Sequence, residues 1–171
     1  EACKERGAAV TLILGPSTEA VPAGIELLRV KAAQEMYDTC LERFNDTDIA
    51  IMSAAVADYT PVQVAAEKIK KKEDALTLEL KKTPDILRKL GQLKKPGQFL
   101  AGFALETNNE KEHALGKLRS KNADIIIMNS LNDKGAGFGH DSNKITIFDK
   151  AGNEFAFETK LKKEVAADIV D

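Results

Sequence analysis

The protein has 171 residues, of which 43% are hydrophobic and 30% are charged, and this is the composition of an ordinary globular domain. Its formal net charge is −2, from 25 basic and 27 acidic residues, which excludes the basic excess of a dedicated nucleic-acid-binding protein. A chain of this length favours a single domain with a sizeable core.

The compartment is indicated by what the sequence lacks. No apolar run is long enough to cross a bilayer, and the charged first residues do not resemble a signal peptide. Cys3 and Cys40 are too few for a disulfide framework, and His113 and His140 have no metal-ligand spacing. We therefore expect a cytoplasmic protein with free thiols, no membrane or nucleic-acid partner, and no metal site built from side chains.

The first third of the chain alternates helical and strand patterns. In order we predict a helix end over residues 1–6, strands over 8–14 and 25–30, an amphipathic helix over 31–44 and a buried strand over 49–52. A βαβ fold normally places a strand and a glycine-rich turn before such a first helix. We expect that strand and turn to be missing from this chain.

The remaining elements complete an α/β pattern. Strands are predicted over 76–80, 99–104 and 124–128, helices over 84–91, 110–121 and 160–171, and a hairpin over 145–148 and 154–157. Thr83 is the predicted N-cap of its helix, with Pro84 in the first helical position. The fold class is α/β: a three-layer α/β/α sandwich with a Rossmann-like, mostly parallel sheet and an antiparallel hairpin extension.

Residues 48–72 carry the strongest functional signal. The strand over 49–52 ends in small residues, including Ala54 and Ala55, and reaches an acid at Asp58. Ligands of open α/β sheets bind beyond the carboxyl ends of the strands, and a lysine such as Lys68 suits phosphate as a mobile point charge. This predicts a nucleotide at the strand end, although ordinary packing and a solvated lysine run would produce the same local pattern.

Three weaker signals lie further along the chain. Residues 83–87 expose backbone N–H groups at a helix start, and Lys117 and Lys121 share one helix face, so both positions suit an anion. On local pattern alone, capping and solvation are the favoured explanations of these positions, and core packing is the favoured explanation of Phe103. Residues 135–139 read G-A-G-F-G, which is not the dinucleotide fingerprint and precedes no helix, so a nicotinamide-dependent oxidoreductase is disfavoured.

The order of these motifs is more specific than any one of them. SAAVADY at 53–59, AAEKIKK at 65–71, TPDIL at 83–87, AGFALETNN at 101–109 and the loop GFGHDSN at 137–143 follow one another across the chain. Together they resemble phosphopantothenoylcysteine synthetase, usually the C-terminal half of a bifunctional bacterial flavoprotein. The resemblance covers essentially residues 1–171, which we expect to form one such domain.

The resemblance implies a ligase of coenzyme A biosynthesis that joins 4′-phosphopantothenate to L-cysteine using CTP through an acyl-cytidylate, with Mg²⁺ accompanying the nucleotide. It also implies a homodimer and fusion to, or association with, a flavin-dependent decarboxylase domain. Lys68 would be the catalytic loop lysine. The nucleotide-binding residues carried over are Ala54, Ala55, Asp58, Lys68, Pro84, Asp85, Ile86, Leu87, Phe103, Lys117 and Lys121.

One departure from the family pattern is at the N-terminus. The family has a Gly/Ser-rich segment with an essential asparagine, and it would precede Glu1. Without it the 4′-phosphopantothenate half of the site is incomplete. The alternatives are therefore a nucleotide-binding module without catalysis, or a variant of the same ligase that uses ATP.

Overall fold

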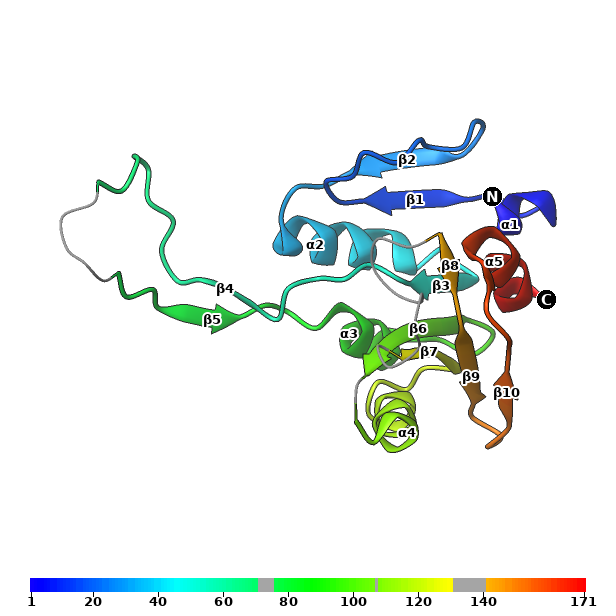
Figure 1. The fold of residues 1–171 in the computed structure, drawn as a ribbon. Coiled ribbons are helices and arrows are strands. Elements are labelled where there is room, and N and C mark those ends of the chain that lie inside the picture. The colour runs from blue at the N-terminus through cyan, green and yellow to red at the C-terminus, as the bar shows by residue number, and fades with distance from the viewer. Residues whose placement is uncertain (71–75, 107, 131–140) are drawn as a thin grey trace.

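A computed structural model describes residues 1–70, 76–106, 108–130 and 141–171 of the protein (Figure 1). Its centre is a five-stranded sheet in the order β10-β9-β7-β6-β3. The strands β3 (Ile49–Met52), β6 (Phe99–Glu106) and β7 (Ile125–Ser130) run parallel, whereas β9 (Ile145–Asp149) and β10 (Glu154–Ala156) form an antiparallel hairpin. The predicted mostly parallel sheet with a hairpin extension is confirmed.

Two more strands form a separate parallel pair. β1 (Thr11–Leu14) follows the short helix α1 (Ala2–Glu5) and pairs with β2 (Glu26–Arg29), with Leu12 opposite Leu27. The described residues give this pair no hydrogen-bonded strand connection to the five-stranded sheet. The helix α2 (Ala33–Phe44) then leads the chain to β3.

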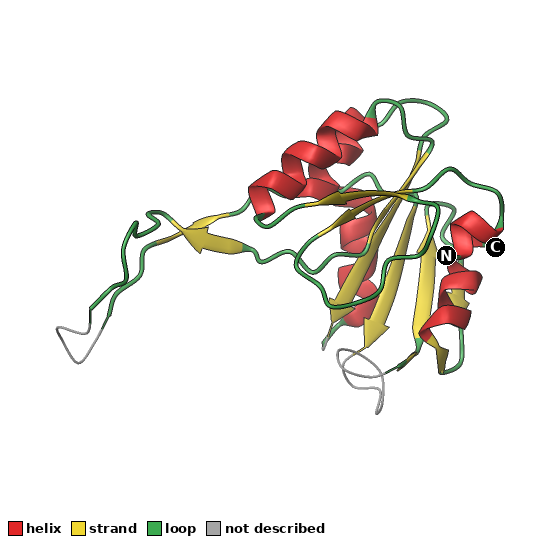
Figure 2. Cartoon of the chain, turned by 90° about the horizontal axis from the view of Figure 1, so that it is seen from above, coloured by secondary structure: helices red, strands yellow, loops and turns green. Residues whose placement is uncertain are grey.

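Helices cover both faces of the central sheet because successive strand residues point to opposite sides. Leu100 and Ala104 of β6 pack into the core beneath α2, α3 (Ile86–Leu93) and α4 (Glu110–Ser120). Ala101 and Phe103 of the same strand pack on the opposite side, with α5 (Lys162–Val170). Figure 2 shows α5 beside both chain ends and the longer helices across the sheet. This is the predicted α/β/α arrangement.

Short pairings and an ion pair close the fold near the chain ends. β8 (Ser142–Asn143) pairs antiparallel with β11 (Lys160–Leu161). Arg6 after α1 donates to the Asp171 carboxylate after α5. Among the described residues, no helix is both long enough and apolar enough to cross a membrane.

A two-stranded arm projects from the body between β3 and α3 (Figures 1 and 2). It consists of β4 (Tyr59–Pro61) and β5 (Leu80–Lys82), antiparallel with Tyr59 opposite Lys82. The strand that we predicted over residues 76–80 therefore lies later in the sequence, at Leu80–Lys82. Alternation of apolar and polar residues locates a strand reliably only when one face of the strand is buried. The arm is exposed and has no buried face, so the alternating pattern at 76–80 did not mark the residues that pair.

The start of α3 also differs from the prediction. Its N-cap is Asp85, whose Oδ1 accepts a hydrogen bond from the Arg88 backbone N–H at 2.9 Å. Thr83, the predicted cap, instead donates its hydroxyl to the Ala57 carbonyl at 2.6 Å, and its N–H donates to the Asp58 carbonyl at 2.9 Å. Thr83 therefore joins the two ends of the arm, and Pro84 precedes the helix.

Gly102 in β6 leaves room for a neighbouring helix rather than for a ligand. A Cβ atom built there would lie 2.6 Å from Cδ2 of Leu87 and 3.0 Å from Cδ1 of Ile126. The glycine thus lets the first turn of α3 approach the sheet closely.

A charged cluster lies at the edge of the sheet where the parallel strands β6 and β7 begin. The Lys94 ammonium donates to both oxygens of the Asp124 carboxylate at 2.8 and 2.7 Å, and the Leu100 N–H donates to the same carboxylate at 2.7 Å. Lys150 approaches the other side of Asp124 at 3.0 Å. The cluster joins the end of α3 to the starts of β6 and β7.

Candidate functional site

The carboxyl ends of the parallel strands lie along one edge of the sheet. Because β3 pairs with β6 and β6 with β7, the chain leaves all three strands on the same side. Residues 53–58 leave β3 there, and Ala54, Ala55 and Asp58 are exposed. Open α/β sheets bind their ligands at this edge.

The predicted segment 84–87 returns from the arm to the same region. Its Ile86 side chain is buried in the core, and Leu87 packs over Gly102. A ligand beside this segment would therefore meet mainly backbone atoms and the Asp85 carboxylate. The sequence of residues 84–87 does not by itself distinguish the buried apolar side chains from the exposed backbone of this segment.

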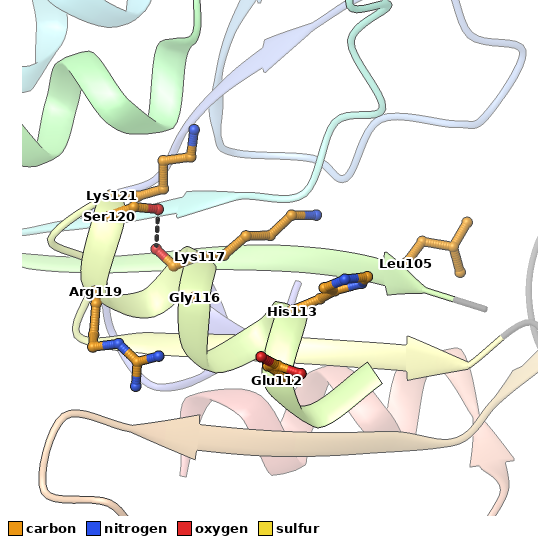
Figure 3. A pocket seen from close by; sticks show the side chains of 8 residues that line it. All are labelled: Leu105, Glu112, His113, Gly116, Lys117, Arg119, Ser120 and Lys121. Atoms are coloured by element: carbon orange, nitrogen blue, oxygen red, sulfur yellow. Dashed lines mark hydrogen bonds between the residues drawn. The ribbon is translucent and has the colours of Figure 1, made fainter. Parts of the chain in front are cut away.

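The start of α3 forms one wall of this region, and α4 with the end of β6 forms a second wall. An open hollow of about 740 Å³ lies here, and the described residues that line it, shown in Figure 3, are Leu105, Glu112, His113, Gly116, Lys117, Arg119, Ser120 and Lys121. Two of the predicted ligands, Lys117 and Lys121, thus lie in one hollow. The side chains of Lys117 and His113 both extend toward Leu105 in the close view.

An ion pair joins the two walls. The Lys121 ammonium donates to Oδ2 of Asp85, while Oδ1 of Asp85 caps α3. Partial burial of Asp85 opposes ionisation, but the hydrogen bonds from Lys121 and the Arg88 N–H outweigh it and lower the pKa of this carboxyl. Asp85 is therefore ionised at neutral pH and holds the Lys121 side chain against the start of α3.

Backbone packing sets the position of Lys121. Gly91 in α3 faces the backbone of Lys121 so closely that an added Cβ would overlap the Lys121 carbonyl. The Asn122 side chain donates to the Gly91 carbonyl at 2.8 Å. The end of α4 is thus anchored on α3, and the Lys121 side chain reaches back toward Asp85.

Of the predicted residues, only Lys117 and Lys121 line this hollow, and two of the others lie on separate parts of the molecule. Lys68 lies between β4 and β5, the two strands of the arm, and is exposed. Phe103 is half-buried on the face of the sheet that packs with α5, opposite the face covered by α4. The structure therefore unites Asp85, Lys117 and Lys121, and places Lys68 and Phe103 on separate parts of the molecule.

Two further residues at this edge were not predicted as ligands. His113 lines the hollow, and its position four residues before Lys117 is a periodic signal that could have identified it. Asn129, near the end of β7, has a buried Oδ1 that accepts no hydrogen bond within the described part of the chain. Such unsatisfied acceptors are rare and often have a functional explanation. No sequence pattern distinguishes this asparagine.

Within residues 1–70, 76–106, 108–130 and 141–171, no three His, Cys, Asp or Glu side chains gather closely enough to bind an ion. Asp58 and Asp85 are the predicted site residues with carboxylates, and Asp85 already accepts two hydrogen bonds. Any Mg²⁺ at this edge would depend mainly on oxygens from a bound phosphate ligand and water.

The comparison with known families decides the family. The model of the DNA/pantothenate metabolism flavoprotein C-terminal domain matches residues 1–171. The chain belongs to this family. The resemblance drawn from the motifs is confirmed at this level.

Curated relatives and a solved structure agree with this assignment. The coenzyme A biosynthesis bifunctional protein CoaBC of Bacillus subtilis (strain 168) is 43% identical over 171 residues, which cover 99% of this chain and 42% of that protein. The C-terminal domain of a CoaBC has been solved by crystallography. It superposes with a TM-score of 0.82 at 35% identity, covering 99% of this chain and 75% of that one.

A third relative carries a different name. A protein called cysteine/cysteine sulfinic acid decarboxylase, from an unknown prokaryotic organism, is 48% identical over 171 residues, which cover 99% of this chain and 48% of that protein. The chain therefore spans about half the length of the curated relatives it matches. Their names describe whole proteins, and the matched half includes all the site residues discussed above.

Proposed function

We propose that this chain is the ligase domain that joins 4′-phosphopantothenate to L-cysteine using CTP. The observation that carries the proposal is its 43% identity, over nearly the whole chain, to a coenzyme A biosynthesis bifunctional protein, and the solved C-terminal domain of a CoaBC has the same fold. The edge of the sheet supports it, because small residues, two lysines and the start of a helix converge there. Such an edge suits a nucleotide with its phosphates.

The reaction proceeds in two displacements. A carboxylate oxygen of 4′-phosphopantothenate attacks the α-phosphorus of CTP, the bond to the β-phosphate oxygen breaks, and pyrophosphate leaves. The amine of cysteine then attacks the activated carbonyl carbon, the bond to the cytidylate oxygen breaks with its electron pair, and CMP leaves as the amide forms. The amine loses a proton in this second step.

The protein contributes position and positive charge rather than a nucleophile. Lys117 and Lys121 supply cations in the α4 hollow, and the Asp85 carboxylate orients Lys121. Mg²⁺, when bound with the nucleotide, neutralises phosphate charge. Lys68 comes from the exposed arm, so it reaches the α-phosphate only when the arm lies against a bound nucleotide.

The exposed arm is also the proposed contact with a second copy of the chain. It carries several large apolar side chains in solvent, including Val64, Leu76 and Leu78 with exposed fractions of 88%, 65% and 58%. Exposed apolar groups concentrated on a projecting hairpin favour association. Sedimentation of the purified protein over a range of concentrations tests this homodimer.

The length of the relatives supports a further partner. Because CoaBC relatives continue well beyond the matched half, a flavin-dependent decarboxylase domain is proposed as the fused or associated partner. The resulting protein is proposed to act in the cytoplasm.

Calorimetry and a turnover assay test the function. CTP and ATP are titrated separately into the chain, and pyrophosphate release is then measured with CTP, Mg²⁺ and 4′-phosphopantothenate in the natural full-length protein. CTP-dependent release, followed by amide product when L-cysteine is added, is the expected result. Binding without release identifies a nucleotide-binding module, and preferential use of ATP identifies the ATP-dependent variant.

A further inference from the structure

His113 and two lysines form a continuous row on α4. His113, Lys117 and Lys121 are spaced by four residues, and each step of four turns the direction by only about 40° around a helix with 3.6 residues per turn. All three line the same hollow. In Figure 3 the Glu112 and Arg119 side chains point to the other side of the helix from Lys117 and Lys121.

The row has a direction relative to the sheet. Because α4 begins just after β6 ends, His113 in its first turn lies nearest the carboxyl edge, and Lys121 lies at the far end. The Lys121 ammonium is held by Asp85. His113 and Lys117 thus come from the part of α4 nearer the end of β6, and the Lys121 ammonium lies against the start of α3.

The chemistry of the imidazole suits this place. A histidine ring donates a hydrogen bond in its neutral form and two when protonated, so it binds a phosphate oxygen in either state. His113 is exposed, and its ring lies beside Leu105 in the close view. The lysines on the same face would keep a phosphate anionic and close.

We propose that His113 is a further binding residue for a phosphate group at this edge, acting with Lys117 as the outer part of the row. The proposal rests on the proposed function, because that reaction has two phosphate-bearing substrates. One is the triphosphate of CTP and the other is the phosphate of 4′-phosphopantothenate. The shared chemistry is an anionic phosphate oxygen accepting from the ring N–H.

The test compares His113→Ala, His113→Lys and the control Arg119→Gln in the natural full-length protein. The control removes a charge from Arg119, which also borders the hollow but whose side chain points to the other side of α4 from Lys117 and Lys121. The dissociation constant of CTP and that of 4′-phosphopantothenate are measured by calorimetry, with KM and kcat for each. Because His113 is exposed, the urea midpoint is expected to stay unchanged in all three variants.

A charge-assisted hydrogen bond corresponds to about a tenfold or greater change in affinity. We expect His113→Ala to weaken one phosphate-bearing substrate by about tenfold through KM, with kcat nearly unchanged, and His113→Lys to retain most of the affinity. If only the affinity for CTP falls, His113 binds the triphosphate. If only the affinity for 4′-phosphopantothenate falls, His113 binds the phosphate of that substrate. Both support the proposal.

Other outcomes overturn it and separate it from the ligase assignment. If the enzyme turns over and His113→Ala behaves like Arg119→Gln with both substrates, His113 has no binding role. If the parent binds CTP in a His113-dependent manner without turnover, the ligase assignment alone fails. If the parent binds neither substrate, both proposals fail.

Discussion

Replacing Asp124 tests how much its hydrogen bonds at the starts of β6 and β7 contribute to the stability of the fold. Its carboxylate receives two bonds from Lys94 and one from the Leu100 N–H, and its side chain is only 20% exposed. Asp124→Asn keeps the shape but turns an N–H donor toward either Lys94 or Leu100. The variant therefore loses a charge-assisted bond and leaves a donor unsatisfied.

The magnitude follows from those contacts. A hydrogen bond to a charged group contributes about 1.5–3 kcal/mol, and an unsatisfied buried donor costs about 1–3 kcal/mol. Since water reaches part of the cluster, we expect a total loss of about 3 kcal/mol in the free energy of unfolding. For a domain of this size, that lowers Tm by about 6–12 °C.

The pH dependence provides an independent signature. Burial would raise the pKa of Asp124, but the bonds from Lys94, Leu100 and Lys150 outweigh it and lower the pKa. A carboxylate with a lowered pKa stabilises the fold above its unfolded pKa of about 3.9, and this contribution is lost as pH falls through the folded value. The stability gap between parent and Asp124→Asn is therefore full at pH 7 and shrinks only below about pH 4.

Urea unfolding at pH 3–7 measures both effects. The control is Glu154→Gln, which breaks the exposed Lys111–Glu154 ion pair and is expected to cost less than about 1 kcal/mol. A loss below about 1 kcal/mol for Asp124→Asn at pH 7 would refute the reasoning, as would a gap that persists unchanged at pH 3.

Three further predictions follow from the site and the core. Lys68→Gln should lower the single-turnover rate of cytidylate formation about 10²–10³-fold while retaining CTP binding. Lys71 lies outside the described residues, and Lys71→Gln should lower the same rate far less. The reverse order of the two variants would refute the role assigned to Lys68. Ala55→Leu should weaken CTP binding in calorimetry without lowering Tm, and unchanged affinity would remove Ala55 from the site. Burial raises the pKa of the Cys40 thiol to about 11, so at pH 8 a disulfide reagent should label the more exposed Cys3 rapidly and Cys40 only after unfolding; equal rates would contradict this burial.

The α/β class was predictable because it depends on local periodicity. The apolar runs at 49–52, 99–104 and 124–128 are short and bounded by polar residues, as buried parallel strands require. The hairpin at 145–157 has its own turn, and its register follows from neighbouring residues. The motif order across the chain likewise identified the family, since every motif is readable without knowing its neighbours in space.

Other features depend on contacts between residues far apart in the chain. Thr83 and Asp85 are both good N-cap residues, and only the hydrogen bond from Thr83 to Ala57 across the arm leaves the cap to Asp85. Gly102 could have faced a ligand, and only the packing of α3 placed Leu87 over it.

The site shows the same division. From sequence alone, the helix start and the four-residue spacing made Asp85, Lys117 and Lys121 possible anion contacts, and the family resemblance selected them as nucleotide-binding residues. The packing of the end of α4 against α3 brings these three residues together, with His113 beside them. Phe103 lies on the opposite face of the sheet. Side-chain identity specifies which interactions a residue can make, whereas the tertiary structure brings together the partners that make them.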